Sequence, residues 1–158
     1  MSLSVGDPAP DFTLYDDERR PWTLSDHRGH AVVLLFFPGA FTSVCTTEMN
    51  VVNNDLARYS GGGARVAGIS TDSPDVLAEF KAVNDLRFPL LSDHDAEVAE
   101  AYGVRFTREE HRLGFSRVAK RAVFVVDGGG RIVHVEVLAH PGLEPDYDAL
   151  LEAVDGVA

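Results

Sequence analysis

The sequence predicts an α/β fold in which helices flank a central mixed β-sheet. Two uninterrupted apolar runs, at 31–37 and 122–126, are typical of strands that are buried on both faces of a sheet. Between them the pattern changes to that of amphipathic helices. The order of strand 31–37, helix 43–59 and strand 64–69 is that of a parallel β-α-β unit, which requires a sheet with helices packed on its faces.

An N-terminal β-hairpin is expected ahead of this unit. Asp11–Tyr15 alternates between apolar and polar residues, 16–21 is a polar turn, and Trp22–Leu24 follows as the partner strand. His27 and His30 have a spacing that metals sometimes use. No cysteine or suitable carboxylate cluster accompanies them, so no metal site is expected.

The only cysteine of the chain, Cys45, falls in the first turn of the predicted helix 43–59. Pro38 and Gly39 end the preceding strand, and Thr42 is a good N-cap residue. The partial positive charge and unpaired N–H groups at a helix N-terminus both favour the thiolate, which is the nucleophilic form of cysteine. Position alone leaves two interpretations open, a reactive thiolate or a small buried hydrophobe on the inner face of the helix.

The rest of the chain supplies further helices and strands in one continuous series. In order, the pattern predicts a helix that begins at Pro74 with Ser73 as its N-cap, an extended piece at 88–91, a short helix ended by Gly103, the strand 122–126, an alternating strand at 131–138, and a last amphipathic helix through Tyr147 and Val154. No internal repeat, linker or low-complexity tract divides this series. A single domain over residues 1–158 is therefore expected.

Residues 104–121 are the least regular part of the sequence and its most basic part. The basic residues are Arg105, Arg108, Arg112, Arg117, Lys120 and Arg121, against only Glu109 and Glu110. Two interpretations remain open for this segment. It is either a solvated loop with ordinary ion pairs, or a loop that brings positive potential to the thiolate.

The composition is ordinary for a soluble globular protein, with 45% apolar and 25% charged residues in 158. The formal net charge of −11 disfavours nucleic acids and anionic membranes as partners. No apolar run approaches the roughly 20 residues that span a bilayer, and the N-terminus lacks the features of a signal peptide. A lone cysteine cannot form an internal disulfide, so a cytoplasmic location is expected.

The letters around the cysteine fit the pattern Pro-x-x-x-Thr-x-x-Cys, from Pro38 to Cys45. This resembles the active-site motif of the peroxiredoxins, which are thiol peroxidases with a thioredoxin-like fold. Val5–Phe12 is similar to the N-terminal segment of that family, and Lys120–Asp127 is similar to the later strand that starts with its active-site arginine. The chain looks most similar to the one-cysteine, AhpE-like branch, because it has a single cysteine and the sequences Phe-Phe-Pro and Phe-Thr-Ser-Val-Cys.

The resemblance implies a thiol-dependent peroxidase that reduces hydrogen peroxide or organic hydroperoxides and uses no cofactor. Cys45 would be the nucleophile, and Thr42 would bind the peroxide together with the backbone N–H of Cys45. Pro38 would shield the sulfur, Arg121 would stabilise the thiolate and the transition state, and Glu48 would support Arg121. Ordinary roles also remain open: Thr42 as a plain N-cap, Arg121 as a surface charge, and Glu48 as an exposed helical residue.

A one-cysteine cycle is expected because no second cysteine is present to resolve the sulfenic acid that peroxide forms. Asn50 occupies the position at which some relatives carry a resolving cysteine. An external reductant would regenerate Cys45, either a low-molecular-weight thiol or a thioredoxin-, glutaredoxin- or mycoredoxin-like protein. Because the family commonly dimerises near its active site, a homodimer is expected. The alternative function is a redox sensor or binding module in which peroxide oxidises the same cysteine without efficient turnover.

Overall fold

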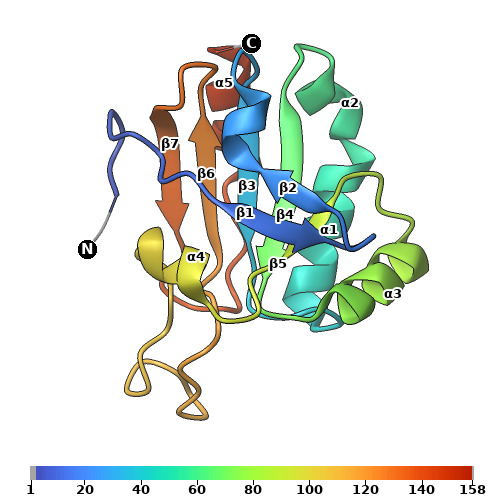
Figure 1. Cartoon of the computed structure of the whole chain (residues 1–158), viewed down its shortest axis with the longest axis vertical. Coiled ribbons are helices and arrows are strands. Elements are labelled where there is room, and N and C mark those ends of the chain that lie inside the picture. Colours follow the sequence, from blue (N-terminus) through green and yellow to red (C-terminus); the bar gives the residue numbers. More distant parts are fainter. Residues whose placement is uncertain (1–2, 158) are drawn as a thin grey trace.

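The structure is a computed structural model that describes residues 3–157, and its centre is a seven-stranded sheet (Figure 1). The strands are β1 (Thr13–Asp16), β2 (Pro21–Thr23), β3 (Val32–Phe36), β4 (Arg65–Ser70), β5 (Leu90–Ser92), β6 (Ala122–Val126) and β7 (Ile132–Val137). The helices are α1 (Ser43–Asn54), α2 (Leu56–Ser60), α3 (Pro74–Asn84), α4 (Glu97–Ala101) and α5 (Tyr147–Asp155), with a short 3-10 turn η1 (Leu24–His27). None of the helices in residues 3–157 has the length and apolar character needed to span a bilayer.

The sheet is mixed, as the sequence predicts, with the order β2-β1-β5-β4-β3-β6-β7. Strands β3, β4 and β5 are parallel to one another, and β6 joins β3 in the antiparallel direction. The predicted N-terminal hairpin is present as β1 and β2, and β1 extends the sheet next to β5. The strands β3 and β6 are fully buried, which explains their uninterrupted apolar sequences.

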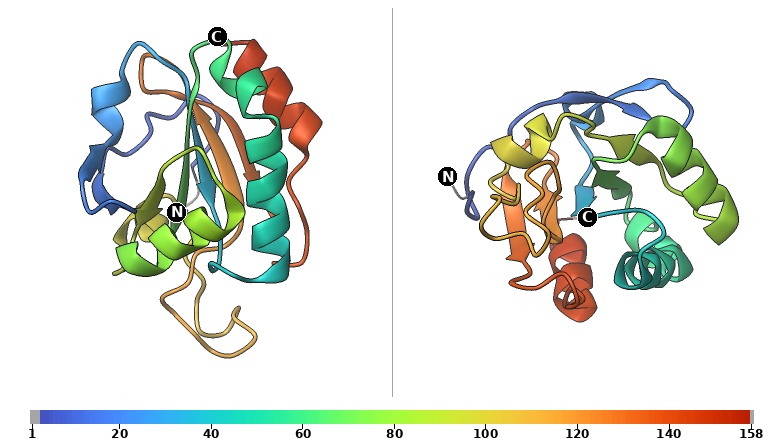
Figure 2. Two further views of the ribbon diagram at one scale, coloured as in Figure 1. Left: turned by 90° about the vertical axis from the view of Figure 1, so that its right-hand side faces the viewer. Right: turned by 90° about the horizontal axis from the view of Figure 1, so that it is seen from below.

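Helices cover both faces of the sheet, and each face has its own hydrophobic core (Figure 2). Residues of α1, α2, α3 and α5 pack on one face against alternate residues of β3 and β6, such as Val33 and Val123. Residues of α4 and η1 pack on the other face, against Leu34 and Phe124. Cys45 belongs to the first of these cores, together with Val33 and Leu35 of β3, so the helix that carries it packs directly on the sheet.

The predicted helix 43–59 is wrong in one respect, because it is interrupted at Asp55. The guanidinium of Arg87 donates a hydrogen bond to the backbone carbonyl of Asn53 at 2.9 Å. That carbonyl would accept from residue 57 in a continuous helix, so a residue from another part of the chain competes for it. The interruption leaves the first turn of α1, where Cys45 lies, unchanged.

Residues 104–121 contain no helix or strand and project from one end of the molecule, where Figure 1 draws them in gold. A single antiparallel bridge between Arg105 and Ala119 joins the two ends of this projecting segment. The segment therefore begins beside α4 and returns to Arg121 at the start of β6.

Gly68, in the middle of β4, allows Leu90, Phe37 and Met49 to pack closely against this strand. A Cβ atom there would lie 2.7 Å from Cδ2 of Leu90 and 3.2 Å from Cε1 of Phe37. We expect Gly68→Ala to lower the free energy of unfolding by about 1–3 kcal/mol, because the buried neighbours must move. Urea denaturation measures the change. Gly129→Ala, in an exposed turn, is the control and should change stability by less than about 0.5 kcal/mol. Equal stability of the two variants would contradict the prediction.

Candidate active site

Cys45 lies in the first turn of α1, and its side chain is almost fully buried, with 1% of the residue exposed. The chain leaves β3 through the buried Phe37, turns at Pro38 and Gly39, and enters the helix at Thr42, which has extended backbone angles. The turn is tight enough that Phe41 adopts a positive φ of 66°, a conformation that costs a residue with a side chain about 1–3 kcal/mol. The fold therefore holds the sulfur at the positive end of α1.

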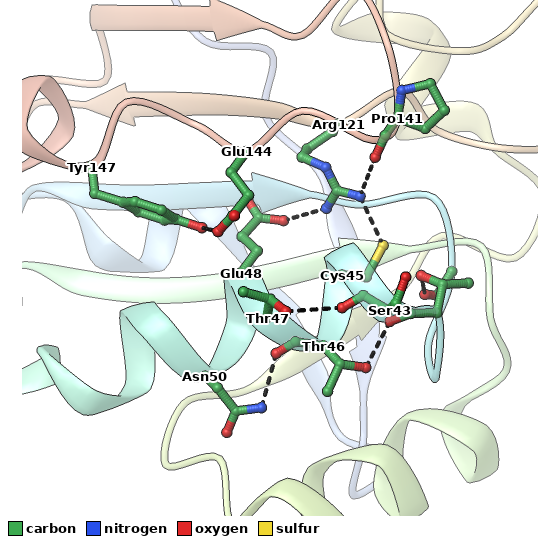
Figure 3. A network of polar contacts seen from close by, with 12 residues as sticks. Ser43, Cys45, Thr46, Thr47, Glu48, Asn50, Arg121, Pro141, Glu144 and Tyr147 are labelled. Carbon is green, nitrogen blue, oxygen red and sulfur yellow. Dashed lines mark hydrogen bonds and ion pairs between the residues drawn. The ribbon is translucent and has the colours of Figure 1, made fainter.

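Arg121 lies far from Cys45 in the sequence, directly before β6, and its side chain reaches the sulfur (Figure 3). Its Nη2 donates to Sγ of Cys45 at 3.2 Å and to the carbonyl oxygen of Pro141 at 2.9 Å. Its Nη1 donates to Oε1 of Glu48 at 2.6 Å. Because β3 and β6 are neighbours in the sheet, residues 76 positions apart in the chain meet in one buried cluster.

Burial excludes two of the ordinary roles that the sequence left open. Arg121 is 2% exposed and Glu48 is 0% exposed. Arg121 is therefore not a surface charge, and Glu48 is not an exposed helical residue. Cys45 is both a buried residue of the core and the acceptor of a hydrogen bond from a cation, so the two interpretations of its position are not alternatives in this structure.

Two of the buried ionisable groups, Glu48 and Arg121, have shifted pKa values. Burial raises the pKa of Glu48 to about 7, against the opposing effects of the Arg121 charge and hydrogen bond, and Glu144 and Glu136 raise it further. Burial disfavours the charge on Arg121, but Glu48 and Cys45 outweigh it and raise the pKa of the guanidinium. The arginine therefore remains a permanent cation, whereas the glutamic acid can gain or lose a proton near neutral pH.

The hydroxyl of Thr42 does not cap α1, so the plain N-cap role is not the one this side chain has. It donates instead to the carbonyl oxygen of Gly39 at 2.8 Å. A hydroxyl that donates one bond still has lone pairs with which it can accept another. Thr42 is exposed and lies one turn before Cys45. Its Oγ1 can therefore accept a hydrogen bond from a donor that approaches from solvent.

Two contacts of this site escape sequence reasoning. Asp72, in the loop after β4, accepts a hydrogen bond from the backbone N–H of Ala40 at 2.8 Å and so fastens the turn before Cys45. The carbonyl of Pro141 holds Arg121. A backbone carbonyl carries no sequence signal, but an aspartate in the loop that follows a buried strand is a signal that could have identified Asp72.

The basic residues of the projecting segment have two kinds of contact, surface ion pairs and a buried contact to the sulfur. Lys120 and Arg117 form ordinary ion pairs with Glu110 and Asp95, as the solvated-loop interpretation predicts, whereas Arg121 at its end contacts the sulfur. A cavity of about 320 Å³ lies between this segment and the 139–141 loop. It is lined by Pro38, Phe106, Glu110, His111, Arg112, Ala139, His140 and Pro141. The cavity thus adjoins Pro38, the residue that precedes the turn to Cys45.

The two histidines whose spacing resembles that of metal ligands face an arginine in the structure. His27 and His30 each lie near the guanidinium of Arg65, at 3.5 Å and 3.4 Å. Within residues 3–157, no group of three His, Cys, Asp or Glu side chains is arranged to hold a metal ion.

Comparisons with known proteins find relatives over most of the chain. A sequence model of the AhpC/TSA family matches residues 5–135. A Mycobacterium tuberculosis protein whose name assigns it to the peroxiredoxins is 40% identical over 131 residues, 83% of each chain. Peroxiredoxin Bcp of Escherichia coli is 35% identical over 133 residues, 84% of this chain and 85% of that one.

Solved structures with a similar fold are named as members of the same group of proteins. The crystal structure of peroxidoxin BcpB from Mycobacterium tuberculosis has a TM-score of 0.86 at 30% identity and covers 99% of both chains. That of a peroxiredoxin-like protein from Aquifex aeolicus has a TM-score of 0.90 at 26% identity and covers 100% of this chain and 90% of the other.

Proposed function

This chain belongs to the AhpC/TSA family of peroxiredoxins, thiol-dependent peroxidases with a thioredoxin-like fold, and on that premise we propose that it reduces peroxides at Cys45 through a one-cysteine cycle. The single observation that carries the proposal is the hydrogen bond of 3.2 Å from Arg121 to the sulfur of Cys45, at the N-terminus of α1. A cation and a helix N-terminus together favour a thiolate.

In the proposed reaction the thiolate of Cys45 attacks one oxygen of the peroxide and the O–O bond breaks. The products are a sulfenic acid on Cys45 and an alkoxide or hydroxide, which takes up a proton to leave as an alcohol or water. Arg121 supplies positive charge where negative charge passes from sulfur to oxygen, and it cannot lose its proton at physiological pH. Two acceptors hold it in place, since Glu48 and the carbonyl of Pro141 both accept hydrogen bonds from its guanidinium.

Two groups next to the sulfur would bind the peroxide itself. The backbone N–H of Cys45 lies in the first turn of α1, where N–H groups have no partner within the helix. Thr42 Oγ1 would accept the hydrogen bond from the peroxide O–H while it donates to Gly39. Pro38 precedes the turn and would limit the access of water to the sulfur.

We expect Thr42→Val to slow the oxidation of Cys45 by hydrogen peroxide by about 10²–10³-fold, because it removes one positioned polar group and keeps the shape of the side chain. Stopped-flow measurement of the second-order rate constant tests this. Thr42→Ser is the control, since it keeps the hydroxyl and should retain most of the rate. If Thr42→Val and wild type react equally fast, the hydroxyl does not bind the peroxide.

The one-cysteine cycle follows from the composition of the chain, which has no second cysteine. An external thiol would attack the sulfenic acid of Cys45, and a second thiol would then release Cys45 from the mixed disulfide. Peroxiredoxins as a class use thiol or thioredoxin-type reductants, and here the candidates are a low-molecular-weight thiol or a thioredoxin-, glutaredoxin- or mycoredoxin-like protein. This cycle is that of the AhpE-like branch, although the named relatives include Bcp proteins.

Steady-state consumption of peroxide with a supplied thiol tests the proposed cycle. An active one-cysteine peroxidase continues to consume peroxide as long as thiol is present. A redox sensor would be oxidised once, consume one equivalent and stop.

A homodimer and a single-domain organisation complete the proposal. Leu113 and Phe115 of the projecting segment expose 69% and 54% of their surface, and large exposed apolar side chains are common where subunits meet. A monomer in sedimentation equilibrium at micromolar concentration would argue against the dimer.

A further inference from the structure

The buried site contains one cation, Arg121, and two acids, Cys45 and Glu48. The charge of the site therefore depends on which of the two acids carries a proton. Arg121 lies between Cys45 and Glu48 and donates to both. Among residues 3–157, Oε2 of Glu48 and Nε of Arg121 are buried and have no hydrogen-bond partner. The pair is thus joined by one hydrogen bond of 2.6 Å and not by the two parallel bonds of a fully matched carboxylate and guanidinium.

Within residues 3–157, the groups that interact electrostatically with Glu48 do not supply a second positive charge. Besides Arg121, they are Glu136 on β7, Glu144 in the loop before α5, Tyr147 on α5, and Tyr59 on α2. The Tyr147 hydroxyl donates to Oε1 of Glu144 at 2.7 Å, and burial raises the pKa values of both tyrosines, so the two tyrosines stay neutral (Figure 3). The surroundings of Glu48 are therefore negative except for Arg121.

One cation can balance only one buried anion. If Cys45 and Glu48 were both ionised, the buried cluster would carry a net negative charge next to two further carboxylates, which is costly away from water. If only one is ionised, the cluster is neutral. A neutral cluster therefore holds a single proton on one of the two acids, Cys45 or Glu48.

We propose that Glu48 stores the proton that the Cys45 thiol gives up, so that the buried site remains neutral both before and after peroxide oxidises the sulfur. In the reduced enzyme Cys45 is the anion and Glu48 is the neutral acid, whose protonated oxygen is the one without a partner on Arg121. In the oxidised enzyme the sulfenic acid is neutral, and Glu48 becomes the anion that pairs with Arg121.

The protons balance in this scheme with no net uptake from solvent or release to it. The reduced site, with a thiolate and a protonated Glu48, reacts with ROOH to give a sulfenic acid, ROH and an ionised Glu48. The S–O bond forms, the O–O bond breaks, sulfur is oxidised, and the alkoxide obtains the equivalent of the proton that Glu48 loses. Glu48 does not touch the peroxide in this scheme, and solvent can carry the proton between them.

Glu48→Gln separates proton storage from simple positioning of Arg121. Glutamine is the neutral isostere of protonated glutamic acid, and its Oε1 can still accept from Arg121. We expect the thiolate absorbance at 240 nm to titrate at nearly the same pH as in wild type. We also expect oxidation by one equivalent of hydrogen peroxide at pH 7 to take up one more proton from solvent than in wild type, as a pH indicator in weak buffer reports. Glu144→Gln is the matched control, a nearby carboxyl without a contact to Arg121, and it should take up the wild-type number of protons.

Two results would overturn the proposal. Equal proton uptake by wild type and Glu48→Gln would mean that Glu48 does not change its protonation. A thiolate titration that moves to lower pH by about 1–3 units in Glu48→Gln would mean that an ionised Glu48 opposes the thiolate in wild type. Should Glu48→Gln fail to fold, wild type alone decides: a thiolate at pH 7 together with uptake of one proton on oxidation would contradict proton storage.

The inference rests on the proposed function only in that peroxide must oxidise Cys45. The two can fail separately. If no sulfenic acid forms with peroxide, as mass spectrometry would show, the proposed function is wrong. If the sulfenic acid forms at a normal rate with the wrong proton count, only the role of Glu48 is wrong.

Discussion

Replacement of Cys45 by serine is expected to abolish the reduction of peroxide while the fold remains intact. A serine hydroxyl is close in size to a thiol but remains protonated at neutral pH, so it offers no nucleophile to the O–O bond. Turnover should fall to the uncatalysed background, which for enzymes generally means a loss of about 10⁶-fold or more. Peroxide consumption in the presence of a thiol reductant measures this loss.

The fold of Cys45→Ser provides the control for that measurement. The residue is 1% exposed in the core between α1 and the sheet, and Arg121 can donate to a serine oxygen as it donates to the sulfur. Far- and near-ultraviolet circular dichroism should therefore match wild type. Peroxide turnover that survives in a folded Cys45→Ser protein would refute the assignment of this residue as the nucleophile.

Replacement of Arg121 by alanine is expected to have the second largest effect on activity. It removes the cation that donates a hydrogen bond to the sulfur, so the oxidation of Cys45 should slow by about 10²–10³-fold. The midpoint of the pH–rate profile should move to higher pH, because the thiolate then lacks its counter-charge. Stopped-flow oxidation by hydrogen peroxide from pH 5 to 9 measures both effects.

The same substitution should also destabilise the protein. Removal of one partner of a buried ion pair costs about 3–5 kcal/mol, because the other charge is left unpaired, and here protonation of Glu48 limits the loss. The double variant Arg121→Ala with Glu48→Gln removes both partners and is the control. It should be about as stable as Arg121→Ala at low pH, where Glu48 is protonated, and it should be oxidised as slowly as Arg121→Ala. An unchanged pH–rate profile in the folded double variant would exclude a role for Arg121 in catalysis.

Local sequence patterns predicted the parts of the fold that depend on local forces. The apolar runs of β3 and β6, the N-cap Ser73 of α3, and the turn at Pro38 are all present in the structure. Each reflects a preference that a few neighbouring residues satisfy among themselves, such as the side chain of Ser73 accepting from the N–H of Val76. The motif from Pro38 to Cys45 is a pattern of this kind, and it identified the family.

The interruption of the predicted helix 43–59 shows where local patterns fail. Helix propensity favoured its continuation, but Arg87, in the loop between α3 and β5, donates a hydrogen bond to the carbonyl of Asn53. Propensities amount to a few tenths of a kcal/mol per residue, and a hydrogen bond from a charged group to a backbone carbonyl is worth about 1.5–3 kcal/mol. A contact that depends on distant residues therefore prevailed over the local preference.

By itself the sequence determined which two strands are buried on both faces, that a cysteine lies at the start of the helix after the first of them, and that the family is one of thiol peroxidases. It also supplied Arg121 and Glu48 as candidates, without deciding between surface charges and a buried pair. Only the tertiary structure decided that, because the pairing of β3 with β6 brings Arg121 to Cys45 and buries it with Glu48 against the carbonyl of Pro141. The physical reason is that the protonation of a buried acid depends on every charge around it in space, and those charges come from segments far apart in the chain.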